Sequence, residues 1–94
     1  MSDTEQMVAD YAWVKALIAR RTDLALMRHR VKEIDGHVAV EVDGAHYEAR
    51  AWRAAIDGRI YPSHIDVHGI RHQLVIGSRV SVHVVQHPGA RGDL

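Results

Sequence analysis

Three histidines, His64, His68 and His72, are spaced by four residues, which on a helix would place three imidazole rings on one face. Such a face can hold a metal ion, because imidazole nitrogens are common ligands of zinc and related metals. The residues between them, which include Ile65 and Gly69, instead favour two strands that meet at a turn. In that hairpin His72 lies opposite Ile65, His64 projects from the other side of the sheet, and His68 occupies the turn. We therefore expect the three side chains to diverge, and a histidine metal site is only a third hypothesis for the function.

Sequence signatures of catalysis are missing. The chain has no cysteine, no glycine-rich phosphate loop and no Gly-x-Ser-x-Gly nucleophile turn. The sequence therefore predicts a protein that is not an enzyme and that needs no cofactor. Its eight histidines titrate near pH 6.5 unless their surroundings shift them, so pH sensing is a fourth hypothesis.

Arginine and tryptophan supply a second set of candidates. Exposed tryptophan beside arginine is typical of protein interfaces and of surfaces that stack nucleic-acid bases. If residues 45–53 form a strand, Trp52 lies on its polar face beside Arg50 and Arg53. The predicted partner-binding residues are Trp13, Arg28, Arg30, Arg50, Trp52, Arg53 and Arg59.

Composition and charge favour a protein partner over a nucleic acid. Hydrophobic residues make up 47% of the chain and charged residues 26%, as in an ordinary globular domain. Twelve Lys and Arg residues balance twelve Asp and Glu residues, whereas a nucleic-acid-binding domain usually carries a basic excess. Basic residues are concentrated in 20–32 and 50–79, and acidic residues in 33–49, so the charges alternate in blocks along the chain.

The elements that must position these residues begin with a helix over residues 2–21. Ser2 and Glu5 match a capping box, in which each side chain accepts a hydrogen bond from a free backbone N–H at the helix start. An apolar stripe then recurs at helical spacing through Met7, Tyr11, Val14 and Ile18. Strands are predicted after it, over residues 27–34, 37–42, 45–53, 59–67, 70–76 and 80–86, because glycine-containing turns such as Asp-Gly separate short apolar segments.

The turns also predict strand register. Two-residue turns at 35–36 and 43–44 place Val40 opposite both Val31 and Tyr47, and place Arg30 across from Glu41.

For the last hairpin, burial favours a loop of Gly77-Ser78-Arg79, which matches Ile76 with Val80 and Leu74 with Val82. Segment 46–56 has two interpretations. A strand continues the register, whereas the alanine-rich composition and Gly58 suit a helix and its C-terminus.

One helix cannot cover the apolar face of a flat sheet of five or six strands, so the sheet must curl into a barrel or dimerise. Residues 38–76 contain Val42-Asp43-Gly44, Tyr47-Glu48-Ala49-Arg50 and Leu74-Val75-Ile76, and in outline they resemble the soluble OB-like barrel of the NfeD family. The resemblance favours a barrel. The predicted fold class is therefore α+β, with an N-terminal helix packed on a curled antiparallel β-meander or small OB-like barrel of five to six short strands.

Residues 1–86 are predicted to form a single domain and residues 87–94 a flexible tail. We expect a cytoplasmic protein without a membrane partner, since the chain shows no secretory signal and no apolar run near the about 20 residues of a membrane span. The leading hypothesis is a small module that binds another protein, as a regulator, an adaptor or an inhibitor of the kind carried by phages and mobile elements. The alternative is an OB-like nucleic-acid binder that uses the arginine and tryptophan surface. An exposed sheet edge would favour a homodimer.

Overall fold

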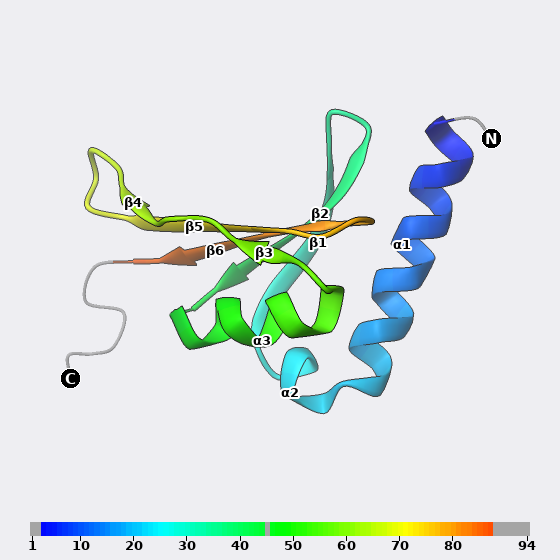
Figure 1. Ribbon diagram of the computed structural model, residues 1–94, viewed down its shortest axis with the longest axis horizontal. Coiled ribbons are helices and arrows are strands. Elements are labelled where there is room, and N and C mark those ends of the chain that lie inside the picture. The colour runs from blue at the N-terminus through cyan, green and yellow to red at the C-terminus, as the bar shows by residue number, and fades with distance from the viewer. Residues whose placement is uncertain (1–2, 45, 88–94) are drawn as a thin grey trace.

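The computed structural model describes residues 3–44 and 46–87 (Figure 1). Its helices are α1 (Asp3–Arg20), α2 (Thr22–Ala25) and α3 (His46–Ile56). Its strands are β1 (Arg28–Ile34), β2 (His37–Asp43), β3 (Arg59–Ile60), β4 (His64–Ile65), β5 (Arg71–Ile76) and β6 (Ser81–Gln86). The α+β class is confirmed. Ser2 of the predicted capping box and residues 88–94 of the predicted tail lie outside the described residues.

Helix α1 confirms the predicted N-terminal helix and buries Val14 and Leu17. A contact with the far end of the chain holds it in place. Arg79, from the loop between β5 and β6, donates from Nε to Oδ1 of Asp10 at 2.9 Å. Its guanidinium group also lies 5.3 Å from the ring centre of Trp13, as in a cation–π contact. We call Asp10, Trp13 and Arg79 the Arg79 latch.

The hairpin of β1 and β2 follows the predicted register. Asp35 and Gly36 have φ angles of 51° and 80°, the two positive values that a type I′ turn requires. Val31 pairs with Val40, and Arg30 pairs with Glu41. The Arg30 Nη2 atom lies 2.8 Å from the Glu41 carboxylate, so the predicted cross-strand ion pair is also present.

The prediction of a strand over residues 45–53 is wrong, and the helix alternative is correct. Ala49, Trp52 and Ile56 recur at helical spacing on α3 and are all buried. The helix ends at Ile56. Asp57, which follows it, takes a positive φ of 53°, and the Gly58 N–H donates to the Arg53 carbonyl at 2.9 Å. Burial of this apolar stripe favours the helix more strongly than the alternating pattern, on which the prediction relied, favours a strand.

Because α3 leaves the sheet, the predicted pairing of Val40 with Tyr47 is also wrong. Val40 instead pairs with Val82 of β6, and β2 and β6 run parallel. The strand order is β1-β2-β6-β5-β3, with β4 paired to β5. The six strands form a mostly antiparallel sheet that is not closed, so the barrel and the simple meander are not formed. The predicted strand 59–67 is divided into β3 and β4 around Pro62, which has no N–H to donate.

The register of the last hairpin differs from the prediction. Val75, not Leu74, pairs with Val82, and Ile76 pairs with Ser81. Residues 77–80 form the loop, closed by a 3.0 Å hydrogen bond from the Gly77 N–H to the Val80 carbonyl. A Cβ atom at position 77 would lie 2.8 Å from the Ile56 carbonyl oxygen, so the chain needs a glycine where this loop passes α3.

The helices pack on one face of the sheet, and Figure 1 shows α3 along that face. The hydrophobic core between the helices and the sheet contains Val14, Leu17, Leu24, Val38, Val40, Val42, Ala49, Trp52, Ile56, Val75, Val80, Val82 and Val84. We call the opposite side the open face, because no described helix covers it. Side chains of Arg30, Glu41, His83 and Leu74 form one row across it. Leu74 and Ile76 are exposed there.

Replacing Trp52 with alanine should lower the free energy of unfolding by about 3–5 kcal/mol, because the side chain is fully buried. Trp52→Phe should be less destabilising, since the indole Nε1 has no hydrogen-bond partner among the described residues. Urea denaturation followed by circular dichroism measures both values. Arg53→Ala, an exposed change on the same helix, is the control and should have little effect. A small loss in Trp52→Ala would contradict the placement of this side chain in the core.

Candidate functional site

The structure gathers a row of histidines on the open face. His64 pairs directly with His72, and their rings stack with centres 5.1 Å apart. His83 of β6 stacks on the other side of His72 at 5.0 Å. The prediction that His64 and His72 diverge is wrong, whereas His68 does lie in the turn. We call His64, His72 and His83 the histidine row.

The loop between β4 and β5 explains the error. The sequence suggested a tight turn at His68-Gly69, but the loop runs over residues 66–70. The Asp66 carboxylate accepts hydrogen bonds from the N–H groups of His68 at 2.8 Å and Ile70 at 3.0 Å. This longer, aspartate-stabilised loop shifts the register by one residue, and such a shift moves a side chain to the other face of a sheet.

One hydrogen bond joins Asp66 to the histidine row, and a second joins two members of the row. Asp66 Oδ2 lies 2.7 Å from His72 Nε2, and His72 Nδ1 lies 2.8 Å from His83 Nε2. The hydrogen bond from His72, followed by that from the Ile70 N–H, lowers the pKa of Asp66 to about 2. The ionised carboxylate can only accept a hydrogen bond, so the Nε2–H of His72 donates to it. In a neutral His72 with its proton on Nε2, Nδ1 is an acceptor, so the hydrogen bond between the two rings is donated by Nε2 of His83.

Burial lowers the pKa of His83, and the neighbouring His72 lowers it further. Glu41, which pairs with His83 in the sheet register, acts in the opposite direction. Lys32 and His64 add to the lowering. His83 therefore resists protonation in the folded state.

The row does not have the geometry of a metal site. Its neighbouring rings are close to parallel, with interplanar angles of 16° and 20°, and the facing nitrogens of His72 and His83 are occupied by their mutual hydrogen bond. Within residues 3–44 and 46–87, no group of three or more His, Asp or Glu side chains is arranged to hold a metal ion.

The predicted arginine and tryptophan surface is not assembled. Trp52 is fully buried, so the expectation that it is exposed is wrong. Arg50 and Arg53 are exposed elsewhere on the circumference of α3, and Arg59 is exposed on β3. The helical period separates Trp52 from these arginines, whereas a strand would have left it on a solvated face.

The remaining predicted partner-binding residues lie at the α1 and β1 end of the molecule. Trp13 is half-buried in the Arg79 latch. Arg28 and Arg30 project from β1 onto the open face. Arg30 pairs with Glu41, and Arg28 Nε lies 3.7 Å from Asp43.

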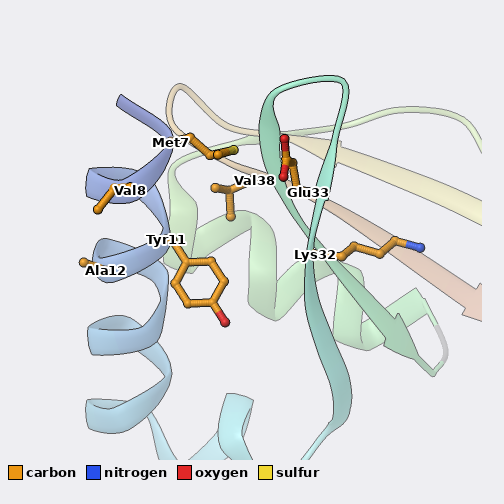
Figure 2. A pocket seen from close by; sticks show the side chains of 7 residues that line it. All are labelled: Met7, Val8, Tyr11, Ala12, Lys32, Glu33 and Val38. Atoms are coloured by element: carbon orange, nitrogen blue, oxygen red, sulfur yellow. The ribbon is translucent and has the colours of Figure 1, made fainter. Parts of the chain in front are cut away.

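A groove lies between α1 and β1 (Figure 2). Its volume is about 350 Å³, and its lining residues are Met7, Val8, Tyr11, Ala12, Lys32, Glu33 and Val38. Met7 and Tyr11 extend from α1 toward the strands, whereas Lys32 extends away from the helix. Val8 and Tyr11 are 61% and 45% exposed, so the groove leaves large apolar side chains in contact with solvent. We call these seven residues the α1–β1 groove.

Sequence reasoning missed this groove although it identified part of its wall. Met7 and Tyr11 belong to the predicted apolar stripe of the helix. The stripe is longer than the surface that covers it, since Val14 and Leu17 are buried while Tyr11 is exposed. An apolar stripe that extends beyond the part of the helix that other elements bury is the signal that could have located the groove.

Strand β1 forms the other wall, and among the described residues it pairs with β2 alone. A two-residue hairpin turn makes Ile34 and His37 a hydrogen-bonded pair, so even-numbered residues of β1 bond to β2. The N–H and C=O groups of Val31 and Glu33 therefore point away from the sheet. The Gly44 N–H, which donates to Val85 in β6 at 2.9 Å, is consistent with this alternation.

Comparison of the chain with protein-family models, curated proteins and solved structures found no match. Among the described residues, no helix is long and apolar enough to cross a membrane. The function of the chain is therefore inferred from the geometry of the groove and of the edge of β1.

The lowered pKa of His83 predicts a loss of stability in mild acid. The unfolded state binds a proton at this residue near pH 6.5, whereas the folded state does so only at lower pH. The contribution of His83 is therefore fully present above about pH 6.5 and is lost as the pH falls through the lower folded-state value. Urea midpoints measured from about pH 7.5 to 5 should fall less steeply in His83→Gln than in the unsubstituted chain. His68→Gln, which changes an exposed turn residue, is the control. Equal slopes in His83→Gln and the unsubstituted chain would contradict the lowered pKa.

Proposed function

We propose that the chain is a small non-enzymatic module that binds another protein through the α1–β1 groove. The observation that carries this proposal is the position of an apolar groove directly beside a strand whose outer edge has no partner among the described residues. Grooves between a helix and an edge strand suit peptide recognition, because backbone hydrogen bonds give affinity and pockets give sequence preference.

The chemistry of the groove supports a protein partner. Val8 and Tyr11 are exposed apolar side chains on one stretch of α1, and the half-buried Met7 and the buried Val38 line the same groove. Aromatic and large aliphatic side chains in a shared pocket are the usual anchors of a protein interface. Lys32 and Glu33 at the margin give the polar rim that such interfaces carry.

The arrangement of charges gives less support to a nucleic-acid partner. Arg30 and Lys32 both contact the Glu41 carboxylate, at 2.8 and 3.5 Å, so these cations are partly neutralised within the sheet. With Trp52 in the core, the tryptophan that was predicted to stack on bases beside Arg50 and Arg53 is not on the surface. A regulator, an adaptor or an inhibitor in the cytoplasm would each act through a groove of this kind, and the absence of cysteine suits that compartment.

Val8→Arg should weaken partner binding by at least about tenfold, because it places a charged group where an apolar side chain is buried by the partner. The unsubstituted chain and this variant are used as baits in an extract of the native host. Proteins retained only by the unsubstituted chain are then purified and titrated by calorimetry.

Val67→Arg is the matched control. It makes the same substitution at a residue that is 93% exposed in the loop between β4 and β5, remote from the groove. A purified protein that binds the unsubstituted chain and Val67→Arg equally, but not Val8→Arg, would support the proposal. Equal binding to all three chains would overturn it, as would binding only to labelled DNA or RNA with a steep salt dependence.

A further inference from the structure

We infer that the partner supplies an extended segment that adds as a strand to the free edge of β1, with acidic side chains toward the open face and apolar side chains in the α1–β1 groove. This inference rests on the proposed function and assigns the chemistry of the occupant.

The backbone of β1 is suited to strand addition. The strand has seven residues, Arg28–Ile34, and its odd-numbered residues direct their N–H and C=O groups away from β2. Those groups face the space beside the strand, where the groove lies. An added strand would satisfy them and would continue the order of the sheet beyond β1.

Charge on the open face selects acidic side chains. Arg28, Arg30 and Lys32 alternate along β1 and project to this face, and Glu41 and Asp43 lie one strand further in. Neighbouring strands are about 4.8 Å apart, so an added strand would meet the basic row first and the acidic row only at about twice that distance. Acidic side chains in the added strand would continue the alternation of basic and acidic rows, and opposite charges across strands are stabilising. Arg28 and Arg30 have side chains that are 87% and 73% exposed. A guanidinium group has five N–H donors, so each can contact a further carboxylate in addition to Asp43 or Glu41.

The opposite face of the added strand selects apolar side chains. Val31 lies on this side of β1 and packs against the core, and Tyr11 and Met7 stand across the groove from the strand. Because side chains alternate along a strand, a segment with acidic residues on one side presents every other residue to the groove. Acidic and apolar residues in alternation are therefore the sequence expected of the occupant.

The same charges disfavour a second copy of this chain as the occupant. In antiparallel pairing of two β1 strands, registers centred on Arg30 or Lys32 place identical cations opposite each other. A register centred on Val31 sets Arg30 against Lys32 of the other copy, and one centred on residue 29 sets Arg28 against Arg30. A register centred on Glu33 places two glutamates together. Like charges thus oppose self-pairing in each of these antiparallel registers.

The test uses a capped, fluorescently labelled seven-residue peptide, matched to the length of β1, in which glutamate alternates with valine and leucine. Fluorescence anisotropy should show saturable binding to the unsubstituted chain, and NMR should show shifts of the Val31 and Glu33 amides. A peptide with lysine in place of glutamate should bind at least about tenfold more weakly. Equal affinity of the two peptides would overturn the charge assignment.

Two backbone-methylated peptides test strand addition on the unsubstituted chain. One carries N-methyl groups on its apolar residues and the other on its glutamates, so each loses the N–H groups along one side of the strand. If the added strand is antiparallel, only methylation of the apolar residues should abolish binding, and if it is parallel, only methylation of the glutamates should. Equal effects of the two methylations, whether both peptides bind or both fail, would overturn strand addition.

Glu33→Pro tests the same point from the protein side. Proline removes the outward N–H of residue 33 without removing a hydrogen bond to β2, a position that edge strands tolerate. Glu33→Ala is the matched control, since it loses the same carboxylate but keeps the N–H. Glu33→Pro should bind the glutamate peptide at least about tenfold more weakly than Glu33→Ala.

The outcomes separate this inference from the proposed function. A partner protein whose binding is lost in Val8→Arg but unchanged in Glu33→Pro would overturn strand addition and leave the groove as a binding site. Binding lost in neither variant would overturn both. Sedimentation that shows a dimer of the unsubstituted chain, abolished in Glu33→Pro but not in Glu33→Ala, would assign the edge to a second copy and overturn the heterologous occupant.

Discussion

The parallel pairing of β2 with β6 is the interaction on which the remaining structure depends. These two strands lie at the middle of the sheet order, and their core-facing side chains, among them Val40 and Val82, are fully buried. Parallel neighbours cannot be joined by a tight turn, so the chain must leave the sheet after β2 and return later. Helix α3 makes that excursion and covers the core as it does so. The pairing also leaves β1 at the edge, since the far side of β2 is occupied by β6.

The features that could be predicted from the sequence are those that residues close together in the chain determine by themselves. The Asp35-Gly36 turn fixes the register of β1 and β2, because only a few residue pairs accept two consecutive positive φ angles. The N-terminal helix follows in the same way from its apolar period. Segment 46–56 carried both patterns, and local reasoning could not choose between them. The choice depends on whether Trp52 has a core to enter, and that core is built by β6, which is distant in sequence.

The histidine row was missed for a related reason. His64 and His72 are brought to one face by a register that depends on the Asp66 side chain, and His83 joins them only because β5 pairs with β6. No spacing within the sequence connects residue 83 to the other two. The groove likewise lies between two separate elements, α1 and β1, and no pattern within the sequence shows that they face each other. Sequence periodicity identifies which faces are apolar, but it does not say where a neighbouring element stops covering them.

A formal net charge of zero hides an ordered arrangement of charges on the open face. Basic side chains follow the edge strand β1 and acidic side chains follow β2, so the outermost row is basic although the pair of strands is nearly neutral. Edge strands expose unpaired backbone groups, and charged side chains along them limit uncontrolled pairing. In this chain the basic row on β1 would repel an identical strand placed beside it. It would not repel a strand with acidic side chains.

The Arg79 latch connects the groove to the centre of the sheet. Asp10 is buried, and its carboxylate is held by Arg79 and by the Gln6 amide at 3.0 Å, on the turn of α1 that follows Met7 and Val8. Arg79 belongs to the loop that leads into β6, so the strand that pairs with β2 also sets the position of the helix that forms one wall of the groove. A buried carboxylate without its cation is strongly destabilising, which ties α1 to this loop more firmly than its apolar contacts alone would. The central pair of strands therefore contributes, through Arg79, to the position of α1 and so to the distance between the two walls of the groove.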